Sequence, residues 1–183
     1  MDKVILLDGG MGTMLQNAGL QPGEMPELYA FEHPEVIANV HRLYIEAGAN
    51  IIYANTFGAN RKKLKKSDKK VSEVITHAIQ VAKSVCKEDT KVALDIGPIG
   101  ELLEPNGYLS FAEAYDIFKE MIDAGVQAGA DLVVFETMSD LMEVKAGVLA
   151  AKEHSSLPIF VTMSFEADHR TFTGCSVASF ALT

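Results

Sequence analysis

Short apolar segments alternate with longer amphipathic segments along the whole chain. The short segments are rich in Val, Ile and Leu and contain almost no polar residue, which is typical of strands buried on both faces of a parallel sheet. The predicted strands are 4–7, 51–54, 92–94, 132–135 and 159–163, and the predicted helices are 34–48, 71–87, 111–128, 141–153 and 177–182. This alternation predicts an α/β fold with right-handed crossovers.

Several helix starts carry local signals. Pro34 stands in a first turn, where its missing N–H is not needed. Ser110 is followed three residues later by Glu113, which predicts a capping box. Ser139 predicts a plain N-cap three residues before Met142.

An internal repeat relates two of the predicted strands. Residues 47–57 (AGANIIYANTF) align without a gap with residues 128–138 (AGADLVVFETM). In each copy a helix ends, a strand follows, and the strand finishes in a polar residue plus Thr. Alternate strands of a (βα)8 barrel place side chains in the same interior layer. The repeat therefore predicts that Asn55 and Glu136 occupy matching places at the mouth of a barrel.

The number of strands leaves two architectures open. A closed TIM barrel needs eight strands, so the five predicted here are too few. An open doubly wound sheet also fits, but its G-x-G-x-x-G fingerprint is absent, because residues 8–13 (DGGMGT) have the wrong spacing. We therefore predict that residues 1–183 are the N-terminal part of a (βα)8 TIM barrel, an incomplete barrel of about five βα units. Interior side chains such as Ile5, Leu7, Ile159 and Val161 would then lack part of their opposing layer.

Charge and hydropathy exclude some partners. A net charge of −9 argues against nucleic acid, and no apolar run approaches the roughly 20 residues of a membrane span. Seven basic residues lie between positions 61 and 70. We expect them to form a solvated loop and helix start; a docking patch for an anionic partner is the alternative.

The N-terminal residues indicate the cellular compartment, and the cysteines indicate whether the chain can bind a metal ion. Residues 1–3 (MDK) lead directly into the apolar segment 4–7 without a basic region or cleavage site, so we expect no signal peptide and a cytoplasmic protein. Cys86 and Cys175 do not make a disulfide framework. Neither they nor the five histidines show zinc-ligand spacing. We assign no metal ligand and no catalytic side chain.

Polar residues follow each predicted strand, where barrel enzymes carry their active sites. They are Asp8, Asn55–Thr56, Asp95, Glu136–Thr137 and Ser164. Gly9 and Gly10 follow Asp8, and glycines bring backbone N–H groups close to a ligand. A zwitterionic amino acid suits this set, with its ammonium on Asp8 and Glu136 and its carboxylate on the glycine amides. The alternative is Mg²⁺ bound by the acids, because Mg²⁺ prefers oxygen ligands.

The ordered motifs resemble the homocysteine S-methyltransferase family. The likeness is greatest to the homocysteine-binding domain of cobalamin-dependent methionine synthase and weaker to betaine–homocysteine methyltransferase. It spans essentially the whole chain and rests on residues 6–13, 34–37, 46–49, 55–60, 97–98, 135–137 and 141–151. The resemblance implies a (βα)8 barrel in which Asp8 and Glu136 hold the homocysteine ammonium and the amides of Gly9 and Gly10 hold its carboxylate. It also places Thr13, Asn55, Thr56 and Thr137 at the same mouth.

The resemblance further implies a reaction and its cofactors. In the methionine synthase that the chain resembles, the zinc-bound thiolate of homocysteine takes a methyl group from methylcobalamin and methionine results. Methyltetrahydrofolate remethylates the cobalamin, on separate cobalamin- and folate-binding modules. The zinc-binding cysteines of the family lie in later strands, and neither Cys86 nor Cys175 matches them. We therefore expect no zinc ligand here and no methyl transfer by this chain alone.

Two alternatives to this function remain. One is betaine or S-methylmethionine as the methyl donor, although a betaine site needs an aromatic cage and the chain has no Trp and only Phe57 after its second strand. The other is a non-catalytic barrel fragment that self-associates or is completed by a partner.

Overall fold

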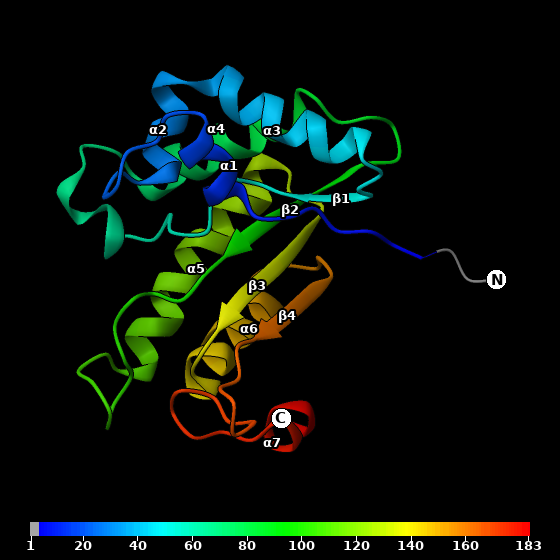
Figure 1. Cartoon of the computed structure of the whole chain (residues 1–183). Helices are drawn as coiled ribbons and strands as arrows, with labels where there is room; N and C mark the ends of the chain where they lie inside the picture. The colour runs from blue at the N-terminus through cyan, green and yellow to red at the C-terminus, as the bar shows by residue number, and fades with distance from the viewer. Residues whose placement is uncertain (1–3) are drawn as a thin grey trace.

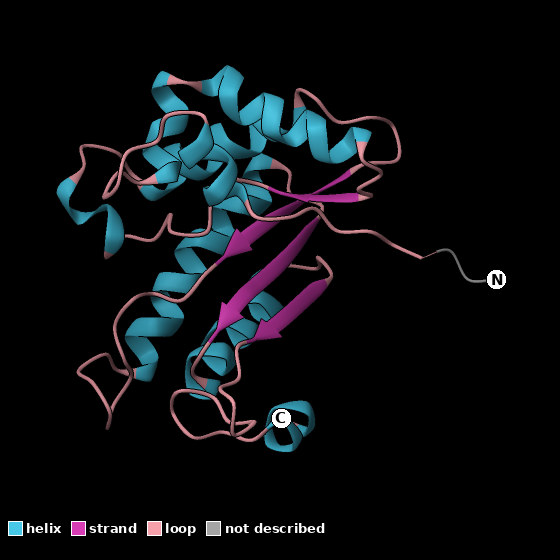
Figure 2. Cartoon of the chain, in the orientation of Figure 1, coloured by secondary structure: helices cyan, strands magenta, loops and turns pink. Residues whose placement is uncertain are grey.

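The fold is built on one parallel sheet. The computed structural model describes residues 4–183. Strands β1 (Ile51–Tyr53), β2 (Lys91–Ile96), β3 (Leu132–Met138) and β4 (Ile159–Met163) lie side by side in chain order, and every neighbouring pair is parallel. Helices alternate with these strands along the chain (Figures 1 and 2), which confirms the predicted α/β fold.

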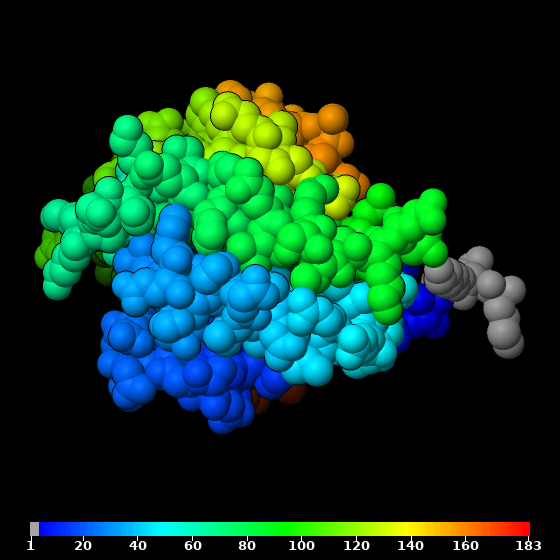
Figure 3. Space-filling view, turned by 90° about the horizontal axis from the view of Figure 1, so that it is seen from above, coloured from blue at the N-terminus to red at the C-terminus, as the bar shows by residue number. Residues whose placement is uncertain are grey.

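The predicted helices are present with small changes at their ends. They are α3 (Pro34–Glu46), α4 (Val71–Lys83), α5 (Phe111–Ala128), α6 (Leu141–His154) and α7 (Val177–Leu182). Helices α5 and α6 cover one face of the sheet (Figure 1). In the space-filling view the successive units follow one another as adjacent bands from blue to orange, as expected for a chain that winds in one direction (Figure 3).

The first predicted strand pairs with β1 but is very short. Residues 4–7 form one parallel bridge, between Leu7 and Ile51. Around it, the N–H of Asn50 donates to the carbonyl oxygen of Leu6 at 2.8 Å, and the N–H of Asp8 donates to that of Ile51 at 3.0 Å. The segment therefore occupies the place of a first barrel strand without forming a regular one.

Two short helices between this segment and α3 were not predicted. They are α1 (Met11–Asn17) and α2 (Pro26–Glu32). Pro26 stands at the start of α2, where proline is tolerated. Leu15 of α1 and Ala30 of α2 are fully buried in one cluster with Ile37 of α3. This packing with α3, rather than an amphipathic pattern of their own, holds the two helices in place.

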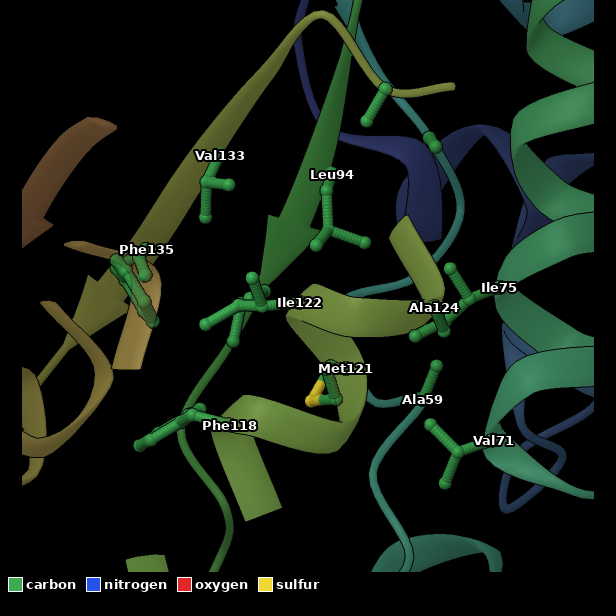
Figure 4. Close-up of a cluster of buried hydrophobic side chains, with 14 of the residues drawn as sticks. Ala59, Val71, Ile75, Leu94, Phe118, Met121, Ile122, Ala124, Val133 and Phe135 are labelled. Atoms are coloured by element: carbon green, nitrogen blue, oxygen red, sulfur yellow. The ribbon is translucent and has the colours of Figure 1, made fainter. Parts of the chain in front are cut away.

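The main core lies between the sheet and helices α4, α5 and α6. Leu94 and Phe135 point from the sheet toward α5 (Figure 4), and the Phe135 ring meets that of Phe118 edge-on at 5.6 Å between centroids. The helices approach closely because they carry glycine at the contact. A Cβ at Gly125 would lie 2.5 Å from a Leu94 methyl carbon, and one at Gly147 would lie 2.4 Å from the Phe135 ring.

The opposite face of the sheet corresponds to the interior of a barrel. Ile51, Ala93, Leu132 and Val134 form a small separate cluster there. In register with Val134, Phe160 of β4 lies on this face and is 41% exposed.

The expectation that Ile159 and Val161 point into the barrel interior is wrong. Both pack against the helix-side core instead. Ile5 and Leu7 do share the interior side with Ile51, because Leu7 is the register partner of Ile51 and alternate residues of a strand share a face. They are 59% and 44% exposed.

Of the two predicted helix caps, one is partly present and the other is absent. The Ser110 hydroxyl accepts a hydrogen bond from the N–H of Glu113 at 3.1 Å, which is one half of the predicted capping box. The Glu113 carboxylate pairs with Lys62 instead of completing the box. For α6 the predicted cap at Ser139 is wrong, because Asp140 caps the helix and accepts from the N–H groups of Met142 and Glu143.

Within residues 4–183, no helix is both long and apolar enough to cross a membrane. The expectation that no signal peptide begins at positions 1–3 lies outside the described residues.

The buried His41 predicts an acid-sensitive stability. It is fully buried in α3, and burial lowers its pKa from 6.5 to about 4. Below pH 6.5 the unfolded chain takes up a proton that the folded chain refuses until about pH 4, so stability falls across that window. Between pH 7 and pH 4.5 we expect the native chain to lose about 2–3 kcal/mol more unfolding free energy than a His41→Gln variant. Urea denaturation at both pH values measures this. Equal losses in the two proteins would contradict it.

Candidate functional site

A pocket of about 440 Å³ opens at the carboxyl end of the sheet. Its walls come from the loop after the first segment, from the start of α2, from the end of β1 and the loop that follows it, and from β2 and β3. Five of the eight predicted binding residues line it: Gly9, Gly10, Asn55, Glu136 and Thr137. Asp8 is not among the lining residues, although it directly precedes Gly9. The two copies of the internal repeat thus contribute Asn55 and Glu136 to one pocket, as predicted.

Asp8 and Glu136 are close enough to influence each other electrostatically. Burial and, to a smaller extent, the charge of Glu136 raise the pKa of Asp8 to about 7, although a hydrogen bond from the Tyr53 N–H at 2.8 Å opposes the shift. Burial also raises the pKa of the half-buried Glu136. Two carboxyl groups that repel each other in a partly desolvated pocket favour a cationic ligand between them.

The glycine pair presents backbone to the pocket. Within residues 4–183 no hydrogen bond uses the N–H groups of Gly9 and Gly10. A Cβ at Gly9 would lie 2.9 Å from the Tyr44 hydroxyl, whereas the space beside Gly10 is open. Tyr44 also donates to the carbonyl oxygen of Gly10 at 3.2 Å, which holds the turn against α3.

Among the other predicted residues, only Asn55 and Thr137 line the pocket. The Asn55 amide donates to the carbonyl oxygen of Pro26 at 2.7 Å and so ties α2 to the end of β1. Thr56 is fully buried and is not among the pocket-lining residues; its hydroxyl bridges the backbone of Asp95. Thr13 is exposed on α1, outside the lining, and Ser164 is also exposed. Thr137 lines the pocket with a left-handed φ of 55°.

Asp95 and Tyr53 complete the concave side of the pocket. Asp95 is 6% exposed, and burial, followed by the charges of Glu136, Asp8 and Glu27, raises its pKa well above the ordinary value. Burial and the same acidic surroundings raise the pKa of Tyr53 to about 12, so its hydroxyl keeps its proton at neutral pH. Asp95 was recognised as a strand-end acid but was not assigned to the amino-acid site.

Three further charged residues, Glu24, Glu27 and Lys63, line the pocket and were not predicted. Glu27 of α2 is buried and accepts a hydrogen bond from the N–H of Gly58. Lys63 donates to the carbonyl oxygen of Pro98 at 2.8 Å, and its ammonium lies 5.3 Å from the centre of the Phe57 ring. Lys63 is partly buried, which the basic run at 61–70 gave no reason to expect.

The neighbours of Lys63 in this run form ion pairs at the surface. Lys62 pairs with Glu101 at 3.2 Å and with Glu113 at 2.7 Å, and Arg61 pairs with Glu120 at 3.1 Å. These contacts are those of a surface loop tied to α5, in line with the expected loop.

The comparison with known families decides the assignment of the chain. Residues 5–183 match the family model described as homocysteine S-methyltransferase. The chain belongs to the homocysteine S-methyltransferase family. Its relatives include methionine synthases from Mycobacterium leprae (29% identical over 97% of this chain) and Mycobacterium tuberculosis (30% over 99%). Betaine–homocysteine S-methyltransferase 1 from Xenopus laevis is 29% identical over 88% of the chain.

Solved structures show the same fold. The metallated and oxidized forms of the homocysteine methyltransferase MmuM from Escherichia coli superimpose with TM-scores of 0.85 and 0.84 at 19% identity, over 99% and 98% of this chain. These family members are TIM barrels, so the incomplete barrel is the fold of this chain. The chain spans 70% and 68% of those two structures, 16% and 17% of the mycobacterial methionine synthases and 41% of the Xenopus enzyme.

The described residues do not fit a zinc site. No group of three or more His, Cys, Asp or Glu within residues 4–183 is arranged to hold a metal ion. Cys86 lies between α4 and β2, where its thiol donates to the carbonyl oxygen of Ala82, and Cys175 lies in the loop after β4. Cys86 precedes β2 and Cys175 follows β4. Because the strands are parallel, the two thiols lie at opposite ends of the strands.

We predict that the 183-residue chain does not retain stoichiometric zinc. Tight zinc sites in proteins use about four soft or imidazole ligands, and the two half-buried thiols cannot approach each other without unfolding the sheet. Atomic emission after dialysis against a weak chelator measures zinc per chain. A Cys175→Ser variant is the control. One zinc per chain in the native protein and none in the variant would contradict the prediction and make Cys175 a ligand.

Proposed function

We propose that this chain is the homocysteine-binding part of a homocysteine S-methyltransferase of the methionine synthase type. The observation that carries the proposal is that two acids, Asp8 and Glu136, stand beside two unused backbone donors that line one pocket with Glu136. Asp8 and Glu136 favour an ammonium, and the N–H groups of Gly9 and Gly10 offer hydrogen bonds to a carboxylate. An α-amino acid carries both charges on neighbouring atoms, as this arrangement requires.

The chain's own residues would orient the amino acid rather than activate its sulfur. With both charged groups held at the mouth, the side chain of homocysteine extends into the concave space that the remaining strands of a barrel would enclose. In the family, a bound zinc ion lowers the pKa of the homocysteine thiol. Residues 4–183 contain no group of side chains arranged to hold that ion. Asn55, Thr137 and the buried wall around Glu27 exclude water from the polar end of the ligand.

Methylcobalamin, remethylated by methyltetrahydrofolate, is the donor we propose. The support is the likeness to methionine synthases, of which this chain spans about a sixth. Such proteins have room for cobalamin- and folate-binding modules beside a barrel of this size. The Xenopus relative makes betaine the second candidate. Against it, the face of Phe57 in the pocket is already covered by the Lys63 ammonium, so it does not offer a cage to a quaternary ammonium.

We predict that Asp8→Asn and Glu136→Gln each weaken L-homocysteine binding. A hydrogen bond between an ammonium and a carboxylate is worth roughly 1.5–3 kcal/mol, so the dissociation constant should rise about tenfold to a hundredfold. Isothermal titration calorimetry on the 183-residue chain measures the change. The matched control is Glu88→Gln, because Glu88 is an exposed acid in the loop before β2. Native affinity in both site variants would place the ammonium elsewhere.

The chain has apolar side chains exposed where further barrel strands would cover them. Ile5, Leu7 and Phe160 are 59%, 44% and 41% exposed on the concave face or its edge. Each large apolar side chain left in water forgoes about 1.5–3 kcal/mol, which is serious against a total stability of roughly 5–15 kcal/mol. We expect the chain alone to self-associate. A second polypeptide carrying the remaining βα units of the barrel should convert it into a compact heterodimer that binds zinc.

Light scattering and near-ultraviolet circular dichroism, with and without the second polypeptide, test this expectation. A Leu7→Lys variant of the chain should self-associate less, because the exposed edge becomes charged. A monodisperse monomer with a sharp cooperative melt, unchanged by the second polypeptide, would show that the four-stranded structure is complete in itself.

A further inference from the structure

Asp95 lies on the concave face of the sheet, one layer below Glu136. It is the register partner of Val134, which belongs to the concave-face cluster with Ala93 and Ile51. Glu136 stands two residues after Val134 and therefore on the same face. At about 3.3 Å per residue, Asp95 is roughly 6–7 Å further from the mouth than Glu136. It lines the same pocket as Glu136, and the charges of both Glu136 and Asp8 act on it.

The backbone N–H and carbonyl groups of Asp95 are hydrogen-bonded, but one oxygen of its carboxyl group is not. The Asp95 N–H donates to the Thr56 hydroxyl at 3.1 Å, and that hydroxyl donates back to the Asp95 carbonyl oxygen at 2.7 Å. The side-chain oxygen Oδ1, in contrast, is buried and has no hydrogen-bond partner among residues 4–183. Buried polar atoms in native proteins are nearly always satisfied, so an orphaned acceptor that lines a pocket marks the place of a ligand donor.

The groups facing Asp95 leave it without a counter-ion. Asp8 stands on the first segment, Glu27 on α2, Tyr53 on β1 and Glu136 on β3, and the three acids all act to keep Asp95 neutral. Lys63 is the one cation among the described pocket-lining residues. Its ammonium donates to the carbonyl oxygen of Pro98, and its charge interacts with Glu27 and Glu143. Burial and these neighbouring acids therefore favour the uncharged form of Asp95.

We propose that Asp95 is a third ammonium-binding residue of this site and that it releases its proton to solvent when the ammonium of a ligand enters. The inference rests on the proposed function, because it takes the ligand to be an amino acid. The ligand keeps all three ammonium protons and donates hydrogen bonds, while the Asp95 O–H bond breaks and the proton passes to the buffer.

This role also defines the class of ligand. The orphaned oxygen requires an N–H donor, which a primary ammonium has and a quaternary ammonium lacks. The site should therefore take α-amino acids with a free ammonium and discriminate against their trimethylated analogues. Charge attraction alone, from Asp8 and Glu136, would not make that distinction.

Calorimetry of L-methionine binding tests the proton release. Methionine has the ammonium and carboxylate of homocysteine but no thiol that titrates. Binding heats measured at pH 7 in phosphate and in Tris, which differ in ionisation enthalpy, give the number of protons released. At pH 7 we expect the native chain to release a large part of a proton per ligand and Asp95→Asn to release less, by up to about one proton per ligand. The variant should also bind about tenfold more weakly. The matched control is Asp89→Asn, because Asp89 is exposed in the loop before β2.

A second measurement needs no substitution. The carboxyl carbon of Asp95, labelled with ¹³C, should move from the chemical shift of a carboxylic acid to that of a carboxylate when methionine is added to the native chain. Methionine binding with no such movement, or with the same affinity and proton release in Asp95→Asn, overturns the role of Asp95 and leaves the proposed function intact. Failure of the native chain to bind either methionine or homocysteine overturns both.

Discussion

The contact between glycine-bearing helices and the sheet determines most of what this molecule can do. Gly125 and Gly147 let α5 and α6 press directly on Leu94 and Phe135, and a methyl group at either glycine would overlap those side chains. This packing holds the parallel strands side by side, so their carboxyl ends lie at the same end of the sheet. The pocket residues Asp95 and Glu136 therefore stand on strands that are packed mainly from the other face of the sheet.

The charges at the carboxyl end of the sheet repel one another, which does not favour the stability of the fold. Asp8, Asp95, Glu136 and Glu27 converge on one pocket, and the nearest lysine is occupied by other partners. A fold maximising its own stability would place apolar or paired groups there. Repulsion that persists in the free protein and is relieved by a cation is typical of a binding site, since perturbed carboxyl groups concentrate at functional positions.

The sequence was sufficient where local pattern and tertiary packing agree. The bounds of α5 and β4 were predicted to the residue, because Ser110 starts the helix and the β4 segment is a clean apolar run. The short helices α1 and α2 were missed, since neither can form on local preference alone and both depend on contacts with α3.

At the site, the identity of the strand-end residues was predictable but their orientation was not. Thr56 follows a tight turn in which its N–H donates to the Ala54 carbonyl at 2.7 Å, and this turn sends the hydroxyl into the core rather than the pocket. The burial of Lys63 depends on Pro98, 35 residues away in sequence, so no short-range pattern reports it. Likewise, the orphaned oxygen of Asp95 is a property of its surroundings and not of its place in the chain.

The weak attachment of the first segment has a consequence for motion. Residues 4–10 are held by one bridge to β1, by the Asn50 side chain, which accepts from the Leu6 N–H at 3.0 Å, by the Tyr53 N–H, which donates to the Asp8 carboxylate, and by Tyr44. Few buried contacts and few shared hydrogen bonds give a segment a low local unfolding free energy. This segment carries Asp8, Gly9 and Gly10, whereas the rest of the pocket stands on the packed sheet. The amides of residues 5–10 should exchange hydrogen with solvent far sooner than those of β2 and β3, and a bound amino acid would slow that exchange by joining the segment to the sheet.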